Sequence, residues 1–283
     1  MCLSNQKDRE ENFVCSFRVE KMEPELWYPD NGKVVKSIIH NRENQRTHVP
    51  LRLDPVGSVF VVFRHSAAKD PVVGVYPEAT VSANHKGSLE IVVSKPGNYQ
   101  LKRASGLTQN VKIAALPETV TISGAWNVEF PLLNKKIVST TFGDLTSWTE
   151  NRDKEIKYFS GTATYSKKID IPAEMISEDR VLYLDLSRVK NLAQVEINGT
   201  DLGVLWKPPF SADLTGKARA GKNTIKIRIT NLWPNRLIGD EQLPENERLT
   251  STSYKHYSKT SPLLESGLIG PVRLVPMIRV EIK

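Results

Sequence analysis

Hydrophobic and polar residues alternate in short runs along most of the chain. The clearest run is 224–230, in which Ile225, Ile227 and Ile229 are separated by polar residues. A period of two places every second side chain on the same face of a β-strand, so this run predicts a strand whose isoleucines face a core. The same alternation occurs in two other runs, with the apolar positions Trp126, Val128 and Phe130, and Leu182, Leu184 and Leu186.

Comparable runs recur through the first 116 residues, about ten residues apart and with turn signals between them. The predicted strands are 13–19, 33–39, 47–53, 58–63, 72–81, 88–93, 98–102 and 108–113. Residues 24–32 are predicted to be a turn bounded by prolines. Short strands joined by tight turns predict an antiparallel β-sandwich domain over residues 1–116.

A second domain is predicted over residues 117–283. Besides the alternating runs already described, strands are predicted at 158–165 and 274–282. Only 173–177 and 244–248 have the pattern of short helical turns. The predicted fold class is therefore all-β for the whole chain.

A β-hairpin is predicted at Asn198-Gly199, because this dipeptide supplies the two positive-φ positions of a type I′ turn. Beyond it, Trp206 stands next to Lys207-Pro208-Pro209-Phe210, and proline cannot donate a hydrogen bond within a central strand. We therefore expect this segment at the rim of a sheet, where an indole can stack on a sugar ring. A tryptophan buried in the sandwich core is the competing interpretation.

Composition and charge argue against several kinds of partner. The 39 Lys and Arg residues outnumber the 32 Asp and Glu residues, but they form no basic block, so no nucleic-acid partner is predicted. No apolar run approaches the roughly 18 residues of a membrane span, so no membrane partner is predicted. Cys2 and Cys15 are predicted to be free thiols. The opening residues lack the apolar core of a signal peptide, which leaves the localisation open.

The sequence contains none of the sharp catalytic motifs. A Walker loop, a Gly-x-Ser-x-Gly elbow and a His-Glu-x-x-His motif are all absent, so no catalytic residue and no cofactor is predicted. The histidines lack the spacing of metal ligands, and no metal is predicted for His40, His48, His65, His85 and His256. Glycoside hydrolysis would need a pair of carboxylates, for which Asp240, Glu241 and Glu265 are the candidates. Solvated carboxylates without a role are the alternative.

A polar and aromatic segment follows the isoleucine run directly. Trp233 offers a flat apolar face to a sugar ring, and Asn231 and Arg236 offer hydrogen-bond donors to its hydroxyls. The predicted carbohydrate contacts are Trp206, Asn231, Trp233, Arg236 and Asp240, with Trp148 and Tyr254 as further candidates. The alternative is a tryptophan that closes the end of the sandwich and an arginine paired with a carboxylate.

Two sets of segments resemble known families. The first set resembles the sugar-binding jelly-roll domain of family-two-type glycoside hydrolases; it comprises Ile197-Asn198-Gly199, Leu202-Gly203, Pro209-Phe210, Asp213-Leu214-Thr215, Gly221-Lys222-Asn223-Thr224-Ile225 and Thr230-Asn231. The second set covers nearly the whole chain and resembles the C-terminal part of large bacterial α-L-rhamnosidases of the glycoside hydrolase family 106 type. It includes Pro24-Glu25-Leu26-Trp27, Leu145-Thr146-Ser147-Trp148-Thr149, Trp233-Pro234-Asn235-Arg236 and Ser266-Gly267-Leu268-Ile269-Gly270.

The resemblance implies a galactose-binding-like jelly roll over residues 117–283 and a carbohydrate partner, for example a rhamnose-containing glycan. In that family the catalytic carboxylates lie in a barrel domain upstream of the resembling segments. No catalytic residue therefore transfers to this chain, and a missing or separate catalytic barrel is the expected partner. Because Leu3-Ser4-Asn5-Gln6-Lys7-Asp8-Arg9-Glu10 resembles the interior of a family strand, we expect a natural fragment, a split gene product or a mis-called start. The family's habit of export implies a periplasmic or extracellular location.

We therefore expect a non-catalytic accessory portion of an α-L-rhamnosidase-like glycoside hydrolase, which packs on a catalytic barrel and holds carbohydrate. Two alternatives stay open. A purely structural interface module would bind no glycan and would expose an apolar patch on the first domain. A catalytically competent glycosidase would need two carboxylates that face each other across a cleft.

Overall fold

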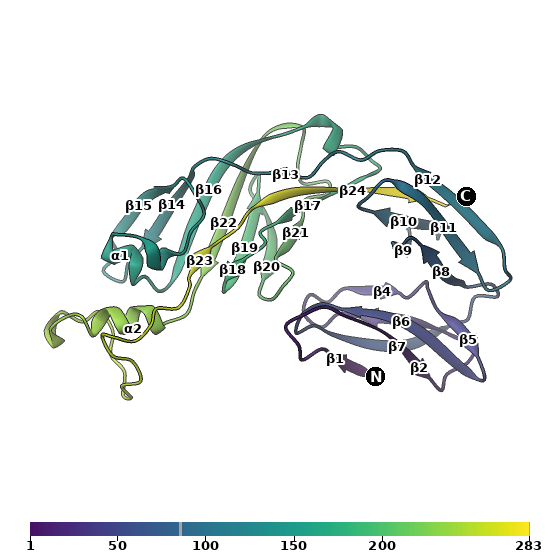
Figure 1. Ribbon diagram of the computed structural model, residues 1–283, viewed down its shortest axis with the longest axis horizontal. Coiled ribbons are helices and arrows are strands. Elements are labelled where there is room, and N and C mark those ends of the chain that lie inside the picture. Colours follow the sequence, from purple (N-terminus) through teal and green to yellow (C-terminus); the bar gives the residue numbers. More distant parts are fainter. Residues whose placement is uncertain (85–86, 283) are drawn as a thin grey trace. The chain divides into compact units, whose positions relative to one another are not determined.

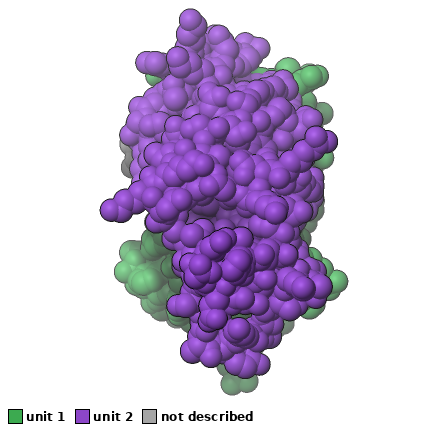
Figure 2. Space-filling view, turned by 90° about the vertical axis from the view of Figure 1, so that its left-hand side faces the viewer, with its two compact units in different colours: residues 1–118, 178–181, 276–283 green, residues 119–177, 182–275 purple. Residues whose placement is uncertain are grey.

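The computed structural model describes residues 1–84 and 87–282. They form two compact units, coloured separately in Figure 2. Unit 1 comprises residues 1–118, 178–181 and 276–283, and unit 2 comprises residues 119–177 and 182–275. The predicted domain division at residues 116 and 117 stays a prediction, and His85 lies outside the described residues. The described part of the chain contains no helix long and apolar enough to cross a membrane.

The first half of unit 1 is a pair of antiparallel sheets around a small core (Figure 1). One sheet has the order β1-β7-β3-β4 and the other β2-β6-β5. The strands are β1 (Cys2–Ser4), β2 (Glu11–Phe17), β3 (Met22–Trp27), β4 (Val34–Lys36), β5 (Asn41–Glu43), β6 (Arg46–Leu53) and β7 (Ser58–Ser66). Their alternate residues form one core cluster of Phe17, Val49, Leu51, Leu53, Val59 and Val61.

The predicted turn at 24–32 is wrong over its first residues, because β3 runs from Met22 to Trp27. Pro24 is tolerated inside this strand because the register with β7 shifts between Glu23 and Pro24. Such a bulge interrupts the ladder where proline has no N–H to donate.

The second half of unit 1 has a separate core. Its strands are β8 (Val72–Tyr76), β9 (Thr80–Ala83), β10 (Leu89–Val93), β11 (Gly97–Arg103) and β12 (Thr108–Ile113). Strands β12-β11-β8 form one sheet, and β10 pairs with β9 and with residues 278–281 of β24 (Arg273–Glu281). The side chains between these strands form the cluster Val72, Ile91, Val93, Tyr99, Leu101, Ile113 and Ile282.

Unit 2 is organised around a six-stranded antiparallel sheet with the order β15-β14-β16-β22-β19-β20 (Figure 1). The strands of this unit are β13 (Val120–Thr121), β14 (Trp126–Pro131), β15 (Ile137–Phe142), β16 (Thr162–Ile171), β18 (Val189–Lys190), β19 (Leu192–Ile197), β20 (Thr200–Leu205), β21 (Ser211–Asp213), β22 (Gly221–Thr230) and β23 (Gly267–Leu268). The unit also contains β17 (Arg180–Asp185) from Leu182 on and the start of β24. The three predicted isoleucines of β22 are fully buried, as are the apolar positions of β14. They pack in one core with Leu182, Leu184 and Leu186. The all-β fold class is thus confirmed, whereas the jelly-roll assignment stays a prediction.

The predicted hairpin is present between β19 and β20. Asn198 and Gly199 have φ angles of 51° and 83°, as a type I′ turn requires. The Asn198 side chain also accepts a hydrogen bond from Thr224 N at 3.0 Å and donates one to Asn223 Oδ1 at 2.8 Å. The dipeptide therefore closes the hairpin and also connects it to β22.

The helical content exceeds the prediction. The short turns η2 (Ala173–Met175) and η3 (Glu245–Glu247) lie within the two predicted segments, but η1 (Trp148–Glu150), α1 (Lys154–Lys157) and α2 (Pro234–Asp240) were predicted as non-helical. Local capping explains two of them. Pro234 occupies the first turn of α2, where its fixed φ suits a helix, and Asp153 caps α1 by accepting from Glu155 N.

Candidate functional site

The polar and aromatic segment predicted to contact sugar begins where β22 ends. Asn231 is buried there, and every polar atom of its side chain is bonded within the protein. Its Oδ1 accepts from Gly161 N at 3.0 Å, and its Nδ2 donates to Phe159 O at 2.9 Å and to Ser266 Oγ at 3.2 Å. Asn231 thus connects the end of β22 to the segments on both sides of it.

Arg236 and Asp240 lie one turn apart on α2 and are the two predicted contacts that the structure brings together. Arg236 Nη2 is 2.9 Å from Asp240 Oδ1, and both side chains are buried. Asp240 also accepts from Thr250 N at 2.9 Å, from Leu249 N at 3.3 Å and from the Thr250 hydroxyl. The ion pair therefore holds the chain beyond α2 against the helix, in agreement with the structural alternative.

Asn235 and Ser266 complete this buried network. Neither of them was among the predicted site residues. Asn235 Nδ2 donates to Leu264 O at 2.7 Å and to Ser266 Oγ at 2.9 Å, and its Oδ1 accepts from Leu264 N at 2.8 Å. Ser266 N donates to Ser147 Oγ at 3.1 Å. Both residues stand in segments that carry the family resemblance, but no local pattern links them, because their partners lie about thirty or more positions away.

The two aromatic candidates are exposed to solvent. The exposed fraction is 53% for Trp206, which follows β20, and 56% for Trp233, which precedes α2. No ring contact joins the two indoles in the described part of the chain. Each can therefore offer a face to a ligand, on separate elements of unit 2.

The two further aromatic candidates differ from each other. Tyr254 is exposed, with its ring 6.0 Å from that of His256. Trp148 is fully buried and belongs to the core, where its Nε1 donates to the Tyr165 hydroxyl at 2.6 Å. Burial raises the pKa of Tyr165 to about 12, although the hydrogen bonds from Trp148 and from the Leu268 amide lower it. With no exposed surface, Trp148 supports the fold and does not contact solvent.

The candidate carboxylates for hydrolysis are each held in an ion pair. Asp240 binds Arg236 as described above, Glu241 Oε1 is 2.8 Å from Arg248 Nη1, and Glu265 Oε1 is 2.7 Å from Arg188 Nη2. Among the described residues, no group of three His, Cys, Asp or Glu side chains is placed to hold a metal.

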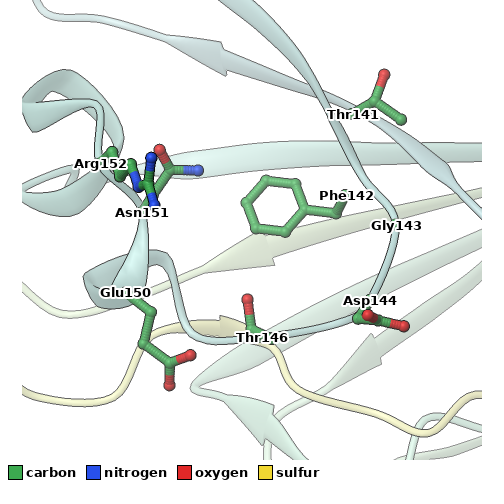
Figure 3. A pocket seen from close by; sticks show the side chains of 8 residues that line it. All are labelled: Thr141, Phe142, Gly143, Asp144, Thr146, Glu150, Asn151 and Arg152. Atoms are coloured by element: carbon green, nitrogen blue, oxygen red, sulfur yellow. The ribbon is translucent and has the colours of Figure 1, made fainter.

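A polar hollow of about 410 Å³ lies elsewhere in unit 2, at the end of β15 and around η1 (Figure 3). It is lined by Thr141, Phe142, Gly143, Asp144, Thr146, Glu150, Asn151 and Arg152. Asp144, Glu150 and Arg152 are exposed, and their side chains make no hydrogen bond or ion pair with the rest of the described chain. This hollow was not predicted from the sequence, because the segment Leu145-Thr146-Ser147-Trp148-Thr149 carries only a family resemblance and no local pattern shows that it meets the end of β15 at the surface.

No protein-family model matches the chain. A Formosa agariphila protein named "Putative beta-glucuronidase" is 36% identical over 211 residues, which is 66% of this chain and 18% of that protein. The solved rhamnosidase from Novosphingobium sp. PP1Y aligns over 97% of this chain and 22% of its own, with 36% identity and a TM-score of 0.75. The chain thus spans about a fifth of the length of each relative. The two matches relate it to a region of glycoside hydrolases.

Proposed function

We propose that this chain is an accessory, non-catalytic region of an α-L-rhamnosidase-like glycoside hydrolase of the family 106 type, and that it packs on a separate catalytic barrel. The alignment with a solved rhamnosidase over 97% of this chain carries the proposal. The ion pairs of Asp240, Glu241 and Glu265 support the non-catalytic role. Glycosidases of the usual kind need two carboxylates positioned across one bond.

We further propose that unit 2 contacts carbohydrate through its exposed indoles. An indole buries a large apolar face at little cost in side-chain entropy, and it stacks well on the C–H face of a sugar ring. Trp206 and Trp233 are exposed enough to do so. Asn231, Arg236 and Asp240 hold the segment that carries Trp233, and their direct contact with sugar stays a prediction.

The test is a titration of rhamnose-containing oligosaccharides against the protein, followed by calorimetry and by tryptophan fluorescence. We expect Trp233→Ala to weaken binding by about fivefold or more, since aromatic residues at the centre of a contact contribute about 1 kcal/mol or more. Tyr76→Ala is the matched control, because Tyr76 is an exposed aromatic residue of unit 1. If neither the wild type nor the variants bind any of these glycans, the sugar-binding proposal is wrong.

A structural interface module is the second candidate, and one face of the first sheet favours it. Cys2 pairs with Phe60, Phe60 with Trp27, and Trp27 with Val34, so all four side chains share one face across β1-β7-β3-β4. Phe60 and Val34 are 40% and 51% exposed. Self-association that Phe60→Ser relieves, together with no glycan binding by the wild type, would favour this candidate.

A further inference from the structure

The polar hollow at the end of β15 is built on a fixed frame. Within η1, Glu150 N donates to Ser147 O and Asn151 N donates to Trp148 O, both at 3.0 Å. Trp148 N donates to Ser266 O at 2.9 Å, and the Trp148 indole is buried in the core. The backbone that carries Glu150 and Asn151 is therefore held in place by hydrogen bonds within η1 and to Ser266.

The side chains around this hollow are of the kinds that bind hydroxyl groups. Asp144 and Glu150 supply acceptors, and Arg152 supplies donors, none of which the described chain occupies. Phe142 also lines the hollow, but it is buried and its ring belongs to the core of unit 2, so the polar side chains form most of the exposed lining. The hollow has a volume of about 410 Å³ and is open to solvent, so it could cover only one side of a sugar ring.

The charges around the hollow are unequal. Two carboxylates and one guanidinium give its lining a formal charge of −1. Figure 3 shows the side chains of Asp144 and Glu150 pointing in different directions, so they do not form a facing pair. A neutral polyhydroxylated ring meets donors and acceptors here, whereas a ligand carboxylate meets two like charges against the one opposite charge of Arg152.

We propose that this hollow binds one uncharged, hydroxyl-rich sugar unit and discriminates against uronic acids. The site is distinct from the Trp206 and Trp233 surfaces, and the inference rests on the proposed function only in that the ligand is a carbohydrate. The two relatives are named as a rhamnosidase and a putative beta-glucuronidase, and the proposed preference separates the two sugars, since a rhamnoside is neutral and a glucuronide carries a carboxylate. The hollow selects the neutral sugar.

The experiment is a two-dimensional amide NMR titration of the full chain at low salt, with methyl α-L-rhamnoside and methyl β-D-glucuronide as separate probes. The rhamnoside is expected to shift the amides of residues 141–152 and to bind at least about threefold more tightly than the glucuronide, as one uncompensated charge allows. The double variant Asp144→Asn with Glu150→Gln leaves Arg152 as the charged group of the lining, so it is expected to abolish or reverse this preference. Glu129→Gln removes an exposed carboxylate of β14 outside the hollow and should preserve it.

The outcomes separate this site from the proposed indole contacts. Shifts confined to residues 141–152 that persist in Trp233→Ala support the hollow, whatever happens at Trp233. If neither sugar shifts these amides, the hollow is not a sugar site, even where residues 231–240 respond. Equal affinity of the wild type for both sugars, or a preference that the double variant retains, overturns the charge selection.

Discussion

Gly267 lies against the Trp148 indole at a distance that excludes any side chain. A Cβ on this residue would be 2.5 Å from Trp148 Nε1, and its φ of +104° is disfavoured for other residues. We predict that Gly267→Ala lowers the free energy of unfolding by about 2–4 kcal/mol, because the indole is fixed in the core and cannot move aside. Differential scanning calorimetry measures the loss as a fall in melting temperature.

Gly143→Ala is the matched control for that experiment. A Cβ on Gly143 would have nothing within 4 Å, and its φ is not in the positive region. This substitution should leave the melting temperature unchanged or raise it slightly, by stiffening the unfolded chain. If both variants melted at the wild-type temperature, the contact of Gly267 with Trp148 would not constrain the fold.

Individual polar residues show where sequence analysis reaches its limit. The residue types of Asn231, Arg236 and Asp240 are equally suited to binding a sugar hydroxyl and to bonding a backbone. The structure bonds the polar side-chain atoms of Asn231 and Asp240 and the Nη2 of Arg236 internally, with partners such as Ser266 and Thr250 that no local pattern links to them. Burial of a polar group is a tertiary property, so the local pattern could not decide between the two roles.

At the scale of elements, the segment between β22 and β23 depends on a few buried amides. Ser266 Oγ accepts hydrogen bonds from both Asn231 Nδ2 and Asn235 Nδ2. We predict that Ser266→Ala loosens residues 231–266 locally, since each amide loses a buried acceptor and an unsatisfied buried group costs about 1–3 kcal/mol. Amide hydrogen exchange should become about tenfold or more faster in this segment and stay unchanged in β22.

The control for this prediction is Ser251→Ala in the same segment. Ser251 is exposed, so its hydroxyl can be solvated and its loss should not alter exchange. Equal exchange rates in Ser266→Ala and the wild type would mean that the hydroxyl does not hold the segment.

Strands were more predictable than helices in this protein, for a physical reason. In a strand with one buried face, apolar and polar residues alternate along the sequence, and Ile225, Ile227 and Ile229 show this pattern in β22. The helix α2 has only seven residues, too few for a helical period to be recognised, and a proline at its start resembles a turn signal. Pro24 likewise resembles a turn signal, although the bulge that accommodates it in β3 depends on the partner strand.

The whole molecule has separate cores in its two units, and each unit contains a tyrosine with a raised pKa. In unit 2, burial raises the pKa of Tyr165 to about 12. In unit 1, burial first and then the charges of Asp54 and Asp30 raise the pKa of Tyr28. The unfolded chain ionises these phenols near pH 10. Above that pH the unfolded state loses a proton that the folded state retains, so the free energy of unfolding falls as the pH rises.

We predict that Tyr165 makes unit 2 sensitive to alkali. Its raised pKa contributes stability that is fully present below about pH 10 and lost as the pH rises through about 12, which amounts to roughly 3 kcal/mol in all. Urea unfolding followed by tryptophan fluorescence reports mainly on this unit, because Trp126, Trp148, Trp206 and Trp233 belong to it and the fifth tryptophan, Trp27, lies in unit 1. Between about pH 9 and about pH 11 the ionisation of Tyr165 should lower the unfolding free energy of the wild type by about 1 kcal/mol.

The variant Tyr165→Phe separates this effect from the rest of the alkaline titration. It removes the acceptor of Trp148 Nε1, so it should be less stable than the wild type at about pH 9, by about 1–3 kcal/mol. Its further loss up to about pH 11 should nevertheless be smaller, since no buried phenol remains to resist ionisation. Tyr28→Phe, in unit 1, should leave the pH dependence of this fluorescence transition as it is in the wild type. If Tyr165→Phe instead lost stability as steeply as the wild type, the alkaline sensitivity of unit 2 would have to come from other groups.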